Sequence, residues 1–226
     1  MLSVVPTPIG HLRDITLRAL DLLRSADFIA CEDTRQTQKL ITAYEIRKPL
    51  LSFHEHSGPA RVAEILGHLK DGKNVALVSD GGMPVVSDPG FELLREVRRA
   101  GLEYEVLPGP NAALTALVAS GLATDSFSFF GFLPQKSAAR KKFLSTLCER
   151  EETLIFYESP FRLARALLDL REVFGDREAA VVRELTKKFE EVARGRLREL
   201  AEKFTKRPAK GEIVILVSGR GRKDIL

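Results

Sequence analysis

A segment of twelve residues, Ser79–Gly90 (SDGGMPVVSDPG), combines residue types that let a ligand approach the main chain closely. It contains three glycines, two prolines and two aspartates. An ordinary turn between a strand and a helix needs only one or two such residues. The segment follows the apolar run Val75–Val78, which reads as a buried strand. We therefore predict a ligand-binding loop at a strand end.

Two other loops are suited to holding a polar ligand atom through the main chain. Val5–Thr16 (VPTPIGHLRDIT) has prolines that stiffen the exit from a strand, and Gly10 permits close approach. In Leu107–Leu114 (LPGPNAAL), Pro and Gly end a strand and Asn111 begins a helix. The amide groups at the start of a helix readily hold a polar atom.

Charged side chains follow a further predicted strand, in Cys31–Lys39 (CEDTRQTQK). Glu32, Asp33 and Arg35 are placed to face the crevice where open α/β sheets bind ligands. Thr34 is also suited to cap the following helix, whose dipole favours the charge of Asp33. A ligand-binding role and a capping role both stay open for this segment.

The elements that carry these loops alternate between strands and helices over the first half of the chain. This alternation predicts a mostly parallel sheet covered by helices on both faces. The expected strands are 2–5, 28–31, 50–53, 75–79 and 104–107, and the expected helices are 16–26, 34–44, 60–70 and 91–100.

The second half predicts a mixed sheet, because two strands near residues 180–195 lie close together in sequence. The expected strands are 126–130, 153–157, 179–183, 190–193 and 213–217, and the expected helices are 112–119, 138–149, 160–173 and 197–203. The fold class is therefore α/β with two α/β domains. We place them at 1–115 and 116–226.

Charge and cysteine content narrow the functional classes. Residues 1–110 hold 13 Lys+Arg against 15 Asp+Glu, and the rest hold 22 against 16, so the basic excess lies in the second half. This favours either solvated helix faces or a polyanionic partner such as nucleic acid. The two distant cysteines, Cys31 and Cys148, argue against a disulfide framework and for a cytoplasmic setting. Neither GxGxxG between a strand and a helix nor a Walker A sequence occurs, and His54 and His56 have no third metal ligand nearby in sequence, so we predict no metal.

Eight strings spread in order over nearly the whole chain resemble the tetrapyrrole-methylase superfamily, and within it the bacterial 16S ribosomal RNA cytidine 2′-O-ribose methyltransferases. They are VPTPIGHLRDITLRALDLL, EDTRQTQKL, LVSDGGMPVVSDPG, LPGPNA, FFGFLP, FYESPFRL, RELTKKFEE and KGEIVILV. The resemblance implies S-adenosylmethionine-dependent methylation of a cytidine in 16S rRNA, usually numbered 1402, with the cofactor in the cleft between the two domains. It also implies a homodimer.

Matching positions in that superfamily imply the residues that contact the cofactor. In the first half they fall on the loops described above, and in the second half on FYES, RELT and KGE. The implied contacts are Ile9, Gly10, Gly82, Met83, Pro84, Asn111, Ala112, Tyr157, Leu185 and Gly211. Asp80 and Asp88 are expected either to stabilise the sulfonium charge or to brace the loop.

Methyl transfer to a ribose hydroxyl suggests catalytic residues, because a positioned base accelerates reaction of a poor nucleophile by about 10²–10⁴-fold. Our hypotheses for the base are Glu184 and Asp33, with Lys187 orienting or polarising the hydroxyl. An ion pair at a strand end is the structural alternative for Glu184.

The expected RNA contacts are basic residues. Lys136, Arg140, Lys141 and Lys142 precede or begin a helix near the predicted domain junction and suit phosphate binding, and Arg13 and Arg35 are expected nearer the reacting ribose. Two other functions stay open: C-methylation of a small tetrapyrrole, and a non-catalytic RNA-binding or ribosome-assembly module.

Overall fold

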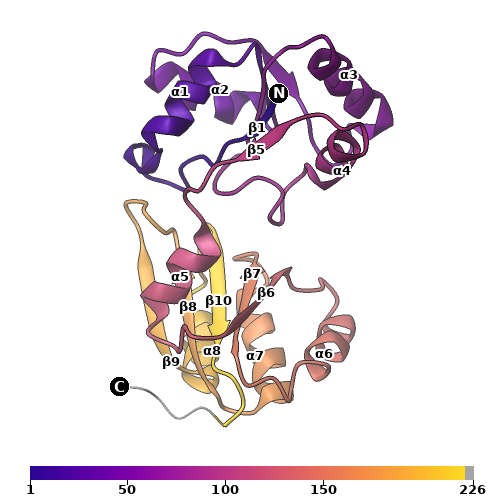
Figure 1. Cartoon of the computed structure of the whole chain (residues 1–226). Helices are drawn as coiled ribbons and strands as arrows, with labels where there is room; N and C mark the ends of the chain where they lie inside the picture. The colour runs from indigo at the N-terminus through magenta and orange to yellow at the C-terminus, as the bar shows by residue number, and fades with distance from the viewer. Residues whose placement is uncertain (222–226) are drawn as a thin grey trace. The chain divides into compact units, whose positions relative to one another are not determined.

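The computed structural model describes residues 1–221 and divides into two compact units, Met1–Asn111 and a unit that begins at Ala112 (Figure 1). The division falls before helix α5 (Ala112–Ser120), whereas the predicted division after residue 115 would cut that helix. Residues 222–226, part of the second predicted domain, lie outside the described residues. No helix within residues 1–221 is long and apolar enough to cross a membrane.

Unit 1 is built on a sheet whose paired strands all run parallel, in the order β3-β2-β4-β1-β5. The strands are β1 (Leu2–Val4), β2 (Phe28–Cys31), β3 (Leu50–Ser52), β4 (Val75–Leu77) and β5 (Tyr104–Val106). Because the strands are parallel, the loops after β1, β2, β4 and β5 all leave the same edge of the sheet.

Helices cover both faces of this sheet, α1 and α2 on one side and α3 and α4 on the other (Figure 1). They span α1 (Leu17–Ser25), α2 (Thr34–Ala43), α3 (Gly58–Lys70) and α4 (Phe91–Arg99). In α1, Ala19, Leu20 and Leu23 recur at helical spacing and are buried against the sheet. Thr16 caps this helix, since its Oγ1 accepts a hydrogen bond from the backbone N–H of Ala19 at 3.0 Å.

Unit 2 has a mixed sheet in the order β6-β7-β10-β8-β9. Its strands are β6 (Phe127–Phe132), β7 (Thr153–Glu158), β8 (Glu178–Arg183), β9 (Glu191–Arg196) and β10 (Ile213–Val217). Strands β6 and β7 are parallel, and the other neighbours are antiparallel. The antiparallel pair β8–β9 is the one that the close spacing of strands near residues 180–195 predicts.

Helices α6 (Ser137–Ser145), α7 (Leu163–Phe174) and α8 (Leu197–Lys206) share one apolar core with this sheet. That core takes alternate residues of β7, β8 and β10, for example Ile213, Ile215 and Val217 of β10. Helix α5 also packs on β8 and β10, but its buried side chains lie outside that core. Both faces of the sheet are therefore covered, and the predicted α/β class with a parallel and a mixed sheet is confirmed.

The differences from the predicted elements are confined to their ends. Strand β6 continues to Phe132 across an irregularity between Phe129 and Phe132, and β9 continues to Arg196. Helix α6 ends at Ser145, earlier than predicted, because a turn follows it. These shifts leave the predicted loops at the ends of the same strands.

Candidate functional site

The loops after β1 and β4 join at the carboxyl edge of the sheet in unit 1. Thr7 and Gly82 exchange two backbone hydrogen bonds, at 3.0 and 2.8 Å, and form an isolated antiparallel bridge. The hydroxyl of Thr7 also donates to the carbonyl oxygen of Ser79 at 3.0 Å. The predicted contact segments around Gly10 and Gly82, distant in sequence, therefore belong to neighbouring loops.

Glycines let these loops approach each other where a side chain would not fit. A Cβ at Gly81 would lie 3.2 Å from the carbonyl oxygen of Pro8, and one at Gly109 would lie 2.7 Å from Cβ of Pro6. A Cβ at Gly82 would face Ile9 at 3.4 Å. The loops after β1, β4 and β5 thus pack closely together at their glycines, and we call this cluster of loops, which includes the predicted contacts Ile9 and Gly82, the cradle.

The glycine-rich loop after β4 holds a strained backbone. Val85 and Ser87 have φ values of +74° and +65°, in the left-handed region that non-glycine residues rarely adopt. Gly90 has φ of +133°, and a Cβ there would lie 2.8 Å from Cγ2 of Val85. Strain of this kind persists where surrounding structure imposes it, often in ligand-binding loops. Met83 and Pro84 begin this strained stretch, half-buried and buried respectively.

Asp33 caps a helix and is tied to its neighbours. Its Oδ1 accepts from the backbone N–H of Arg35 at 2.8 Å, and the Arg35 guanidinium donates to both carboxylate oxygens at 3.0 and 2.8 Å. The hydrogen bonds from Arg35 hold the pKa of Asp33 at about 2. The backbone N–H of Asp33 donates to Oδ1 of Asp80 at 3.0 Å, which links the loops after β2 and β4.

Two other carboxylates at this edge, those of Asp88 and Glu32, are harder to ionise. Burial raises the pKa of Asp88 to about 6; the Ser79 hydroxyl opposes the rise, and the Asp80 carboxylate adds to it. Burial also raises the pKa of Glu32, together with the charges of Asp80 and Asp88. Within residues 1–221, no three His, Cys, Asp or Glu side chains are grouped so that they could hold a metal ion. Together, Glu32, Asp80 and Asp88 make the carboxyl edge of the sheet in unit 1 acidic, which suits a cationic ligand group.

Replacing Asp88 by Asn is expected to stabilise the protein at pH 7–8 by on the order of 1 kcal/mol, allowing for solvent screening. The pKa of Asp88 is about 6 in the folded chain and 3.8 as its ordinary value, so the folded chain binds the proton more tightly. The penalty for ionisation is therefore present in full above pH 6 and disappears as the pH falls toward 4. Urea unfolding at pH 4, 6 and 8 measures the difference in free energy of unfolding between D88N and wild type. An equal difference between D88N and wild type at all three values would contradict it.

In unit 2, the predicted residues Glu184, Lys187 and Gly211 lie together. Oε1 of Glu184 accepts from Nζ of Lys187 at 3.3 Å and from the backbone N–H of Glu212 at 3.1 Å. Nζ of Lys187 also pairs with Oε2 of Glu212 at 3.0 Å. Gly211, with φ of +86°, leaves room for the Glu184 carboxyl group, because a Cβ at Gly211 would overlap its Oε1.

The segment from Glu184 to Thr186 combines a shifted carboxyl pKa with a strained backbone. Burial would raise the pKa of Glu184, but the N–H of Glu212 and the Lys187 ammonium together hold it below its usual range. Glu184 and Thr186 have φ values of +52° and +62°. Among the described residues, left-handed non-glycine residues outside this segment and the β4 loop are limited to Glu45. Strain therefore concentrates in the two segments where the site residues were predicted.

The remaining predicted cofactor contacts are placed as follows. Leu185 is buried between the two strained residues. Tyr157 lies near the end of β7, and its ring packs edge-on against Phe129 with centroids 4.8 Å apart. Asn111 ends unit 1 and Ala112 begins α5. Gly10 is exposed in the loop after β1.

The structure corrects the prediction for Arg140. Its side chain is only 2% exposed, and its Nε and Nη2 donate to Oδ2 of buried Asp169 at 2.9 and 2.6 Å. Nη1 donates to the carbonyl oxygens of Pro134 and Gln135. This arginine fastens the loop before α6 to α7 and is not available to a phosphate.

The other predicted RNA contacts are at the surface. Lys136 and Lys142 are exposed, while Lys141 pairs with Glu172 at 2.5 Å. Arg13 is exposed in a short 3₁₀ helix (Leu12–Asp14). Arg35 is also exposed, but its guanidinium is held by Asp33. Lys136 and Lys142 are therefore the better placed for phosphate contacts in unit 2.

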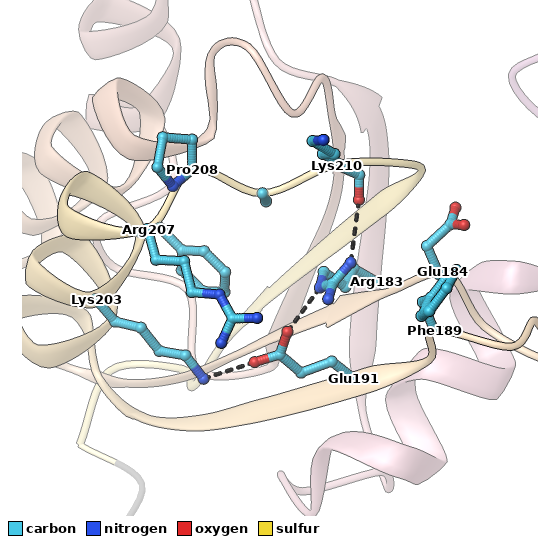
Figure 2. A pocket seen from close by; sticks show the side chains of 10 residues that line it. Arg183, Glu184, Phe189, Glu191, Lys203, Arg207, Pro208 and Lys210 are labelled. Atoms are coloured by element: carbon cyan, nitrogen blue, oxygen red, sulfur yellow. Dashed lines mark hydrogen bonds and ion pairs between the residues drawn. The ribbon is translucent and has the colours of Figure 1, made fainter.

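A pocket in unit 2 was not predicted. It has a volume of about 410 Å³ and is open to solvent between the ends of β8 and α8 (Figure 2). Its lining consists of Arg183, Glu184, Phe189, Glu191, Lys203, Phe204, Arg207, Pro208, Ala209 and Lys210. Apart from Glu184, none of these residues stands out in the sequence, because they come from three separate segments that only the fold brings together.

Comparison with known proteins gives consistent matches. The family model described as Tetrapyrrole (Corrin/Porphyrin) Methylases matches residues 1–201. The chain is 48% identical to "Ribosomal RNA small subunit methyltransferase I" of Bacillus subtilis, over 100% of this chain and 77% of that protein. It is 47% identical to the protein of the same name from Thermotoga maritima, over 97% and 98%. The crystal structure of uroporphyrin-III-C-methyltransferase from Thermus thermophilus has a TM-score of 0.66 at 22% identity, over 95% of this chain and 93% of that chain.

Proposed function

The chain belongs to the tetrapyrrole (corrin/porphyrin) methylase family, and from this premise we propose that it methylates ribosomal RNA of the small subunit. The finer proposal is 2′-O-methylation of a cytidine in 16S rRNA, the nucleotide usually numbered 1402. The observation that carries it is the identity of 47–48%, over nearly the whole chain, to proteins named as small-subunit rRNA methyltransferases. The likeness to the uroporphyrin enzyme, at 22% identity, concerns the fold alone.

Methyltransferases of this family use S-adenosyl-L-methionine, which supplies an activated methyl group on a positively charged sulfur. The cradle of unit 1 fits such a group. Its glycines allow the three loops to pack closely at one edge of the sheet, and the carboxylates of Asp80 and Asp88 there suit a cationic centre. We propose that Ile9, Gly82, Met83 and Pro84 hold the cofactor there. The contacts expected at Tyr157, Leu185 and Gly211 remain predictions for unit 2.

Catalysis by this chain depends mainly on positioning the reactants, since good orientation lowers the activation free energy by roughly 7–11 kcal/mol. We propose Glu184 as the group that takes the proton from the ribose hydroxyl. Its Oε1 is bound by Lys187 and Glu212, while its Oε2 makes no hydrogen bond within residues 1–221. Its lowered pKa keeps it ionised near neutral pH. Asp33 is the weaker choice, because Arg35 occupies both of its carboxylate oxygens.

Replacing Glu184 by Gln tests this role. Gln keeps an oxygen for the N–H of Glu212 but takes no proton, so kcat is expected to fall about 100-fold or more while cofactor affinity stays near that of wild type. Single-turnover methylation and calorimetric cofactor titration measure the two quantities. Unchanged turnover in E184Q would remove Glu184 from the mechanism. Replacing the surface residue Glu172 by Gln serves as a matched control with no expected effect.

Three expectations complete the proposal. The protein works as a homodimer, in the cytoplasm, with Lys136 and Lys142 among its phosphate contacts. The family resemblance supports the homodimer, and the two free cysteines support the cytoplasm. The exposure of both lysines supports their contact with phosphates. Light scattering coupled to gel filtration gives the mass in solution, against 25.1 kDa for one chain.

The function as a whole is tested by methyl transfer from labelled S-adenosylmethionine. Assembled small subunits, naked 16S rRNA and uroporphyrinogen III are offered side by side. Label in the RNA as an alkali-resistant 2′-O-methylcytidine is the expected result, and it also identifies the form of RNA that is the substrate. Label in the tetrapyrrole alone would overturn the proposal. Cofactor binding without any transfer would favour an assembly module.

A further inference from the structure

The pocket of unit 2 has an excess of positive charge. Four of its lining residues are basic (Arg183, Lys203, Arg207 and Lys210) and two are acidic (Glu184 and Glu191). Hydrogen bonds from Lys203 and Arg183 hold the pKa of Glu191 below its usual range, and that of Glu184 is lowered as well. Both carboxylates are therefore ionised near neutral pH. The pocket still carries a net charge of +2, which favours an anionic ligand.

The basic residues divide into two pairs by their contacts. Arg183 donates to Oε2 of Glu191 at 2.6 Å, and Lys203 donates to Oε1 at 2.7 Å, so both are engaged by one carboxylate (Figure 2). The side chains of Arg207 and Lys210 form no ion pair or hydrogen bond within the described part of the chain. Figure 2 shows the Arg207 guanidinium directed into the cavity. These two cations are available to a ligand.

An aromatic ring stands at the same pocket. Phe189 is 65% exposed, in the turn between β8 and β9, and Nζ of Lys188 lies 5.6 Å from its ring centroid. An exposed phenylalanine and unpaired cations in the lining of one pocket are the combination by which proteins bind single-stranded nucleic acid: cations meet the phosphates, and a base stacks on the ring. A small anion would use the cations but has no use for the ring.

The position of the pocket agrees with such a ligand. Glu184, the proposed base, lines the pocket, and Gly211, a predicted cofactor contact, directly follows Lys210. A strand whose ribose reaches Glu184 therefore has its neighbouring nucleotides within reach of the cavity. The residues are not those predicted from the basic run 136–142, which lies on another segment of unit 2.

We propose that this pocket binds the substrate RNA next to the target nucleotide, with a phosphate on Arg207 and Lys210 and an unstacked base on Phe189. This inference rests on the proposed function and adds a specific subsite to it. The cavity of about 410 Å³ is large enough for one base and its phosphate, since small-ligand pockets begin at roughly 300 Å³.

The test measures affinity for fluorescently labelled 16S rRNA, with and without ribosomal proteins, from 50 to 200 mM salt. The double variant R207A/K210A is expected to bind at least about tenfold more weakly and, because one phosphate contact is lost, to lower the slope of log affinity against log salt by about 0.7–1. F189A is expected to weaken binding at least about fivefold, with the slope unchanged. E191Q, which removes a negative charge from the pocket, is expected to tighten binding a few-fold.

Arg198→Ala is the matched control, because Arg198 is exposed on α8, the helix that Arg207 follows, and does not line the pocket. It is expected to leave affinity and salt slope unchanged. Wild-type affinity and slope in both R207A/K210A and F189A would overturn the inference while leaving the proposed function intact. If wild type neither binds nor methylates RNA, the proposed function fails and the inference falls with it. Misfolding would weaken binding. The tighter binding expected of E191Q therefore tests the effect of the pocket's charge separately from any effect of misfolding.

Discussion

Replacing Gly82 by Ala is expected to lower the rate of methyl transfer about 100-fold and to weaken cofactor binding about tenfold. Gly82 has φ of +91°, where an alanine is strained, and its two hydrogen bonds to Thr7 prevent the backbone from relaxing. The new Cβ would point between Ile9 and Pro110, into the cradle. A displacement of about 1 Å at a site that works by positioning costs about 100-fold. Single-turnover kinetics and cofactor titration measure the two losses.

Gly101→Ala provides the control for this prediction. Gly101 also has a positive φ, +66°, but a Cβ there meets nothing within 4 Å, and it lies in the turn between α4 and β5. Both variants are therefore expected to lose about 1 kcal/mol of stability, and G101A alone to keep its activity. Equal activity in the two variants would mean that the cradle does not hold the cofactor.

Replacing Asp169 by Asn is expected to lower the free energy of unfolding by about 3–5 kcal/mol, the largest effect on stability that we predict. Asp169 and Arg140 are each almost completely buried, and Oδ2 of Asp169 also accepts from the hydroxyl of Ser137 at 2.9 Å. Loss of the carboxylate charge leaves the guanidinium without a counter-ion in the apolar surroundings of α6 and α7. Urea unfolding measures the loss of free energy. In thermal unfolding, we expect Tm to fall on the order of 10 °C.

Two further variants define the origin of that loss. Glu172→Gln removes the partner of a surface pair with Lys141 and is expected to cost no more than about 1 kcal/mol. The double change R140M/D169L replaces the buried pair by apolar side chains and is expected to recover much of the stability lost in D169N. A D169N protein as stable as E172Q would contradict the importance assigned to the buried pair.

Local patterns were sufficient to predict most of the fold. In unit 1, each buried strand is a short apolar run and each helix repeats apolar residues at helical spacing, so type and order follow from sequence alone. The ends of elements are decided by contacts that sequence does not reveal. Strand β6, for example, extends to Phe132 because it pairs with Tyr157 of β7 beyond an irregularity.

The candidate site was less predictable wherever a role depends on a distant partner. Arg140 stands in the basic run ARKK and looks like a surface residue, but its partner Asp169 is 29 positions away. A signal for the pair was present: Asp169 falls on the apolar stripe of α7 between Ala166 and Leu170, where a carboxylate requires a partner. The pocket around Arg207 and Lys210 has no comparable signal.

The strand order of unit 1 also has a consequence for synthesis of the protein. Strand β1 lies between β4 and β5, so its hydrogen-bonding partners begin only at residues 75 and 104. During translation, the apolar segment Leu2–Val4 leaves the ribosome long before either neighbour exists, and at about 5–20 residues per second this interval lasts several seconds. Completion of the sheet must wait for the last strand of the unit. An exposed apolar strand with such a delay is a natural binding site for chaperones acting on the nascent chain.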